Sequence, residues 1–222
     1  MKPYKTWGVA LALASALGAG SARADAVYQL AAEQSNYTVA VGDTVEVQIF
    51  LIEQRDAGDP SELFGPGAGL ISAGFRLTFG ASDPSQVLLA DDIAPNPAFD
   101  SGATLVKDAT PGSASLLEDV DFGSPPAQGV ESAPDVVGLW LGTFRFTALA
   151  AGVTGVSVED FDTDPQFINF VTASFTELDA LIQSSRFTIN ATNPGAIPEP
   201  SSLAMAATAA LGLLAAARRR AA

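Results

Sequence analysis

The 222-residue chain contains no cysteine and no histidine. Without cysteine no disulfide can form, so a hydrophobic core has to hold the fold even in an oxidising compartment. Without either residue, Ser–His and Cys–His nucleophile pairs, imidazole acid–base catalysis and the common zinc sites are excluded. Hydrolysis by a pair of carboxylates needs neither residue, and this class of chemistry stays open.

Basic residues are also scarce, with 11 Lys and Arg against 25 Asp and Glu. Most of the basic residues lie near the two ends, so the interval from Asp25 to Glu199 holds all 25 acidic but only 5 basic side chains, a formal charge of −20. Such a surface repels nucleic acid and anionic lipid, and we expect neither as a partner. No cofactor is expected either.

Residues 1–24 have the layout of a secretory signal peptide. Lys2 and Lys5 form a positive region, residues 7–20 are apolar, and Ala22 and Ala24 supply the small side chains that signal peptidase requires at its cleavage site. The apolar run is shorter than the ~20 residues of a membrane-spanning helix, which disfavours an uncleaved anchor. We therefore expect the chain to be exported.

The body, residues 25–193, has a β pattern. Residues 44–52 alternate, with Val45, Val47, Ile49 and Leu51 on one face and Glu46 and Gln48 on the other. Further strands are predicted at 75–79, 136–149, 153–158 and 186–191, with Trp140 on the core side of its strand. Residues 54–70, 90–103 and 118–135 are predicted to be irregular, and 176–183 to be a helical turn or a strand. Short strands between turns predict a single all-β domain, an antiparallel sandwich.

Three segments of the body resemble cohesin domains. They are residues 37–47, with the turn Val41-Gly42-Asp43, residues 72–79, and residues 141–152, which end in an alanine–glycine turn. The resemblance implies a jelly-roll-like β-sandwich, a fold shared with some carbohydrate-binding modules. It does not imply dockerin binding, because a fold does not define a function.

Asp160, Asp162 and Asp164 alternate in the way that the first ligands of a Ca²⁺ loop do. However, Pro165 stands where an EF-hand needs glycine, and Val171 stands where it needs a bidentate glutamate. An EF-hand is excluded, a looser Ca²⁺ site remains an alternative, and we expect a solvated acidic turn with no metal.

Acidic pairs on predicted loops are the candidates for carboxylate catalysis. They are Asp91 with Asp92, Glu118 and Asp119 with Asp121, and Asp56 with Asp59. A glycosidase needs two carboxylates about 5–10 Å apart, one of them with a raised pKa. No spacing in the sequence indicates such proximity, so we expect no catalytic residue and no enzyme.

The last 29 residues, 194–222, have a different composition. Pro198-Glu199-Pro200 is followed by 17 uncharged residues at 201–217, rich in Ala and Leu, and by Arg218, Arg219 and Arg220. The prolines hold the chain extended around Glu199, and the apolar run predicts a short transmembrane helix. The arginines act as a basic stop that keeps this end on the cytoplasmic side.

This arrangement resembles the PEP-CTERM sorting tail. The resemblance implies a Gram-negative bacterium whose exosortase recognises the tail, anchored for a time in the inner membrane, and processes the protein for the cell surface or the extracellular matrix. It also implies a link to exopolysaccharide and biofilm. We therefore expect a non-enzymatic structural or adhesive protein that contacts exopolysaccharide or another matrix protein. The alternatives are a carbohydrate-binding module and, third, a carboxylate-pair glycoside hydrolase.

Overall fold

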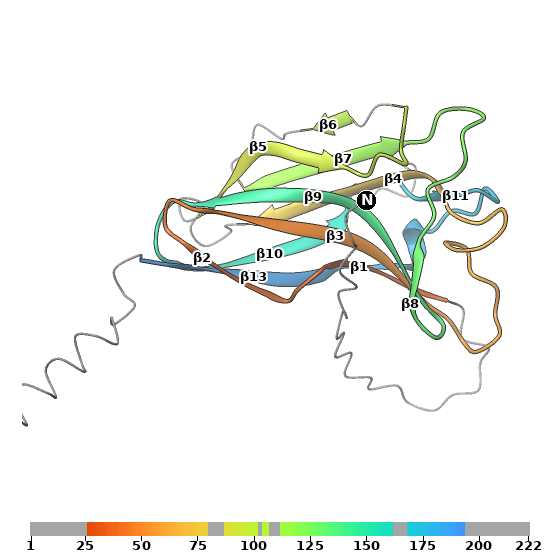
Figure 1. Ribbon diagram of the computed structural model, residues 1–222, viewed down its shortest axis with the longest axis horizontal. Helices are drawn as coiled ribbons and strands as arrows, with labels where there is room; N and C mark the ends of the chain where they lie inside the picture. Colours follow the sequence, from red (N-terminus) through yellow and green to blue (C-terminus); the bar gives the residue numbers. More distant parts are fainter. Residues whose placement is uncertain (1–25, 80–86, 102–103, 107–111, 162–167, 194–222) are drawn as a thin grey trace, which may run out of the picture.

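A computed structural model describes residues 26–79, 87–101, 104–106, 112–161 and 168–193, and of residues 87–92 and 104–106 it describes the backbone only. Within these ranges the chain forms two β-sheets packed face to face (Figure 1). The predicted signal peptide (1–24), its cleavage site and the predicted tail (194–222) with its apolar helix lie outside the described residues. No helix within the described ranges is long and apolar enough to cross a membrane.

The first sheet, called sheet A, contains in spatial order β12 (Ile182–Gln183), β1 (Val27–Ala32), β3 (Thr44–Gln54), β9 (Val136–Ala148) and β5 (Val87–Pro95), and β8 (Val130–Ala133) also pairs with β9. The second, sheet B, contains β2 (Asn36–Ala40), β13 (Ser185–Thr192), β10 (Gly152–Asp160), β4 (Leu70–Phe79), β7 (Ser113–Asp119) and β6 (Thr104–Val106), and β11 (Val171–Thr172) also pairs with β4. A short 3₁₀ helix, η1 (Asp179–Leu181), precedes β12.

The sandwich is antiparallel except where the first and last strands meet. The chain passes from β1 in sheet A to β2 in sheet B, and it makes the same passage from β12 to β13 near its other end. At both places the two segments pair in parallel, β1 with β12 and β2 with β13. The strands close to the two ends of the body therefore link its two sheets along one side.

The alternation predicted for residues 44–52 is confirmed. In β3, Val47, Ile49 and Leu51 are buried between the sheets, whereas Glu46 and Gln48 face solvent. The strands predicted around residues 75–79, 153–158 and 186–191 are confirmed as parts of β4, β10 and β13. Edge-to-face ring contacts cross the core, with Phe75 and Phe144 at a centroid distance of 5.6 Å. Burial of apolar side chains from both sheets therefore stabilises a fold that has no disulfide.

The prediction that Trp140 points into the core is wrong. A β-bulge interrupts the pairing of β3 with β9, because Ile49 is opposite Gly142 but Phe50 is opposite Trp140. The extra residue on β9, Leu141, changes the phase of the alternation, so that Leu139 and Leu141 are buried and Trp140 faces outward, half-buried. The outer face of sheet A therefore carries Trp140 beside Phe50.

Two of the segments predicted to be irregular, 90–103 and 118–135, contain strand residues. Residues 90–95 belong to β5, Glu118 and Asp119 end β7, and residues 130–133 form β8. Segment 176–183 combines both predicted alternatives, since it contains η1 and then β12. The loop predicted at 54–70 is confirmed for residues 55–69. Near its middle, the fully buried side chain of Leu63 anchors this loop to the core.

Candidate binding groove

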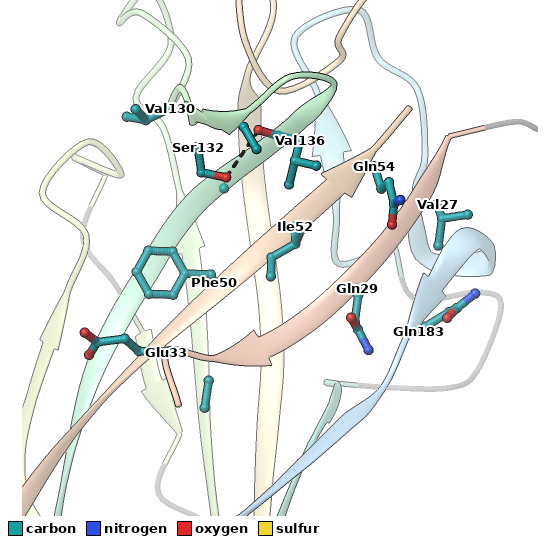
Figure 2. A pocket seen from close by; sticks show the side chains of 13 residues that line it. Val27, Gln29, Glu33, Phe50, Ile52, Gln54, Val130, Ser132, Val136 and Gln183 are labelled. Atoms are coloured by element: carbon teal, nitrogen blue, oxygen red, sulfur yellow. Dashed lines mark hydrogen bonds between the residues drawn. The ribbon is translucent and has the colours of Figure 1, made fainter. Parts of the chain in front are cut away.

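A groove of about 420 Å³ lies on the outer face of sheet A (Figure 2). Five strands contribute to it through residues that are directly opposite one another in the sheet. The central row runs from Gln183 on β12 through Gln29 on β1, Ile52 on β3 and Gly138 on β9 to Val130 on β8. The size is within the roughly 300–1,000 Å³ of small-molecule sites in proteins.

The floor of the groove is apolar and open to solvent. Phe50 and Ile52 are half-buried on the outward face of β3, and the missing side chain of Gly138 leaves a hollow next to them. A Cβ atom placed on Gly138 would lie 3.9 Å from the Phe50 ring, so the glycine keeps this side of the ring uncovered. Val130, which is 71 % exposed, stands at the end of the central row.

Polar side chains surround this floor. Figure 2 shows Glu33 beside Phe50 at one end, Gln54 near the other, and the amides of Gln29 and Gln183 along one side. Each glutamine amide offers two donor hydrogens and an acceptor oxygen. Glu33 is the one ionisable side chain in the lining that the structure describes. The groove is therefore almost uncharged, in a strongly acidic protein.

A buried glutamate supports the groove from beneath. Glu53 is fully buried on the inward side of β3, where it accepts hydrogen bonds from the Tyr28 hydroxyl (3.2 Å), the Ser61 hydroxyl and the Glu62 backbone N–H (2.9 Å). Burial and the neighbouring Glu53 carboxylate raise the pKa of Tyr28 above its usual range. The network ties β1 and β3, two floor strands, to loop 55–69.

Arg55 extends this network to the wall of the groove. Its guanidinium lies 3.8 Å from Glu53 and 3.6 Å from Glu131 on β8, and it also donates to the Asp59 carbonyl oxygen. Its backbone N–H donates to the Asp135 carbonyl oxygen in the turn after β8. Glu53 therefore connects the two floor strands β1 and β3, and Arg55 connects Glu53 to the hairpin formed by β8 and the start of β9.

Replacing Glu53 by glutamine should destabilise the protein by about 1.5–3 kcal/mol, because the hydrogen bonds of its carboxylate are charge-assisted and Arg55 loses a counter-charge. Urea unfolding measures the change. The matched control is Glu46→Gln on the same strand, where the side chain is exposed and paired with Arg145 at 2.6 Å. The control should cost no more than about 1 kcal/mol. Equal losses in the two variants would contradict the structural role of Glu53.

Among the acidic pairs predicted from the sequence, Glu118 differs most from its expected loop position. It is 1 % exposed and points between the sheets from β7, where one oxygen accepts the Asn96 backbone N–H at 3.2 Å. Its Oε1 has no hydrogen-bond partner among the described residues. Burial raises the pKa of Glu118 to about 8, partly opposed by the Asn96 hydrogen bond. The protonated, neutral form of Glu118 therefore predominates at pH 7, and the residue lies in the core, apart from the groove.

The other predicted acidic residues lie in different parts of the fold. Asp56 and Asp59 lie in loop 55–69, whereas Asp91 and Asp92 belong to β5 and not to a loop. Asp119 and Asp121 are exposed. Asp160 accepts a hydrogen bond from the Asn169 amide at 2.8 Å, and Asp162 and Asp164 lie outside the described residues. Within the ranges described, no group of three Asp or Glu side chains could hold a metal ion.

Residues 196–220 match the PEP-CTERM protein-sorting motif. The matched range contains Pro198, Glu199, Pro200 and the three arginines at 218–220, whose individual roles stay predictions. The motif marks an exported protein that exosortase processes and whose C-terminus is anchored in the membrane before processing. No curated protein sequence matches the chain.

The body is similar to solved structures that contain cohesins. It is similar to a chain of a type I cohesin–dockerin complex from Clostridium thermocellum, with 12% identity, a TM-score of 0.48, and coverage of 75% of this chain and 99% of that one. It is also similar to the second type II cohesin module of the ScaA scaffoldin from Acetivibrio cellulolyticus, with 13% identity, a TM-score of 0.47, and coverage of 80% and 96%.

Proposed function

We propose that this protein is an adhesive, non-enzymatic component of the cell surface or extracellular matrix of a Gram-negative bacterium. Exosortase processes it after a transient stay in the inner membrane, and its sandwich then binds exopolysaccharide in the groove of sheet A. The sorting motif at residues 196–220 supports the route of export. The groove is the observation that carries the binding role.

The lining of the groove has the chemistry that a sugar polymer needs. A pyranose ring has an apolar C–H face, which can lie on the exposed surface of Phe50 and Ile52. Its hydroxyl groups donate and accept, and the amides of Gln29, Gln54 and Gln183 around the floor do the same. An apolar surface with a few placed polar groups is the usual composition of a ligand site.

The position of the groove keeps it accessible while the tail is anchored. The body ends at β13, where Thr192 accepts the Val41 N–H next to the Gly42 turn. The groove lies where the end of β3 pairs with the start of β1. These strand ends are at the other end of the sandwich from the end of β13 (Figure 1). A sandwich held by its C-terminus would therefore present the groove away from the membrane.

Adhesion fits the groove better than hydrolysis does. Glycoside hydrolysis needs two carboxyl groups roughly 5–10 Å apart on either side of the scissile bond. In the described lining, Glu33 is the only carboxylate, and the Glu118 carboxyl with its raised pKa is buried between the sheets. Binding without turnover is the function that these residues support.

Affinity electrophoresis through the host's own extracted exopolysaccharide tests the proposal. The protein isolated from its host should be retarded in proportion to the polymer concentration, and Phe50→Ala should remove most of the retardation by taking away the ring of the floor. Val153→Ala is the matched control, because Val153 is 64 % exposed on β10 in sheet B. Equal mobility of the wild type with and without polymer would refute the binding role, whereas retardation unchanged by Phe50→Ala would place the site elsewhere.

A further inference from the structure

We infer that the groove takes an uncharged polysaccharide and that Glu33 makes it selective against anionic ones. This inference rests on the proposed binding role of the groove and adds the class of polymer and the residue that determines it.

The cations near the groove are already engaged with carboxylates. Arg55 lies between Glu53 and Glu131, and its side chain is only 9% exposed. Arg145, further along the same face, pairs with Glu46 at 2.6 Å. A polymer carrying carboxylate or sulfate groups would lose hydration in the groove and find no guanidinium or ammonium group in the described lining to replace it.

The carboxylate of Glu33 would in addition repel an anionic polymer directly. Its backbone N–H donates to the Gln48 carbonyl oxygen at 2.9 Å, which holds the residue beside β3 where the chain leaves β1. Figure 2 shows its side chain next to Phe50, at the end of the aromatic part of the floor. A negative group on a sugar that lies on Phe50 would therefore be close to a like charge. The formal charge of −20 between Asp25 and Glu199 acts in the same direction.

The hydrogen-bonding state of the floor favours a glycan over a peptide strand. Peptide strands are usually bound by adding to a free sheet edge, where backbone N–H and C=O groups are unpaired. The central strands β1, β3 and β9 under the groove each pair with a neighbour on both sides. What the groove offers is side-chain amides and apolar surface, and these suit the hydroxyl groups and C–H faces of sugars.

Isothermal titration of the protein isolated from its host tests the inference at about 0.15 M salt, where charges beyond about 8 Å are largely screened. The probes are three uncharged polymers, dextran, galactomannan and a mixed-linkage β-glucan, and two anionic ones, alginate and polygalacturonate. At least one uncharged polymer should bind at least about tenfold more tightly than either anionic polymer, a difference of about 1.4 kcal/mol.

Glu33→Gln should shift the ratio of anionic to uncharged affinity by about tenfold in favour of the anionic polymers. Glu177→Gln, which removes the same charge from an exposed position outside the groove, should leave that ratio unchanged. Equal affinity of the wild type for both classes, or equal effects of the two variants, would overturn the inference while leaving polysaccharide binding intact. Absence of binding to all five polymers and to the host's own exopolysaccharide would instead refute the proposed function and the inference with it.

Discussion

Replacing Glu199 by alanine should leave the protein in the inner membrane at its unprocessed mass. Pro198 and Pro200 restrict the chain around Glu199 to extended conformations, in which the side chain is free for an enzyme to read. Glu199 precedes the apolar run at 201–217, so its removal should not impair insertion. We therefore expect anchoring without cleavage, measured by membrane fractionation and intact mass in the native host.

The arginine cluster provides the matched comparison. Replacing Arg218, Arg219 and Arg220 together by alanine removes the positive stop of a short, Ala-rich span, so more protein should pass fully across the membrane uncleaved. The two changes separate recognition from anchoring, because one should retain the protein in the membrane and the other should release it. Normal trimming near Pro198 in the Glu199→Ala variant would contradict the role of the motif and favour a plain anchor.

The stability of the protein should fall as the pH rises from about 4.5 to about 8, because of Glu118. Its pKa is about 8 in the folded protein against 4.5 for an exposed glutamate. Between these values the folded state holds a proton that the unfolded state has lost, so rising pH favours unfolding, and above about pH 8 the effect is constant. The slope should approach about 1.4 kcal/mol per pH unit, a total of several kcal/mol.

Urea unfolding at pH 5, 6, 7, 8 and 9 measures this slope. Glu118→Gln, which has nearly the same shape and no titrating proton, should flatten the profile between pH 5 and pH 8. Asp119→Asn on the same strand is the control and should keep the slope, because Asp119 is exposed. A wild-type profile that rises or stays flat over this interval would show that Glu118 is ionised in the folded protein.

The sequence predicts those strands whose alternation is local and uninterrupted. Val47, Ile49 and Leu51 share a face because successive side chains of a strand point to opposite sides, and the same rule places Phe75, Leu77 and Phe79 together. It fails in β9, where the extra residue Leu141 reverses the phase and carries Trp140 to the outside. This bulge depends on the pairing of β9 with β3, which lies about 90 residues earlier in the chain. The sequence of residues 136–148 alone does not indicate it.

The buried glutamates were missed for a related reason. Glu53 continues the inward series of β3, but its acceptance inside the sandwich depends on Tyr28, Ser61 and Arg55, which come from other segments. Glu118 is the last inward-facing residue of β7, a strand that the pattern of residues 113–119 does not predict because only Ala114, Leu116 and Leu117 in it are apolar. A carboxyl group can be buried only where partners from other segments satisfy it, and these partners are distant in the sequence. Composition alone therefore predicts that such residues lie in exposed loops.

One feature of the sequence indicates the groove when the alternation of β3 is followed along the strand. The outward face of β3 carries Glu46 and Gln48 and then changes to Phe50 and Ile52, two large apolar residues on a side that should meet water. An apolar pair in such positions indicates a surface that is used for binding or covered by another segment. Gly138, Gln29 and Gln183 could not have been added to it, because only the pairing of three further strands, β9, β1 and β12, brings them into one row with Ile52.

Retention in the extracellular matrix of the native host is the most direct measurement of the central claim, that a sorted sandwich holds exopolysaccharide in the groove of sheet A. Matrix, medium and membrane fractions are compared for the wild type and for Phe50→Ala, with intact mass recorded in each. We expect wild-type protein in the matrix at a mass that lacks both ends, and Phe50→Ala protein of the same mass released into the medium. Full-length protein confined to the membrane, or equal retention of the wild type and the Phe50→Ala variant in the matrix, would contradict the central claim.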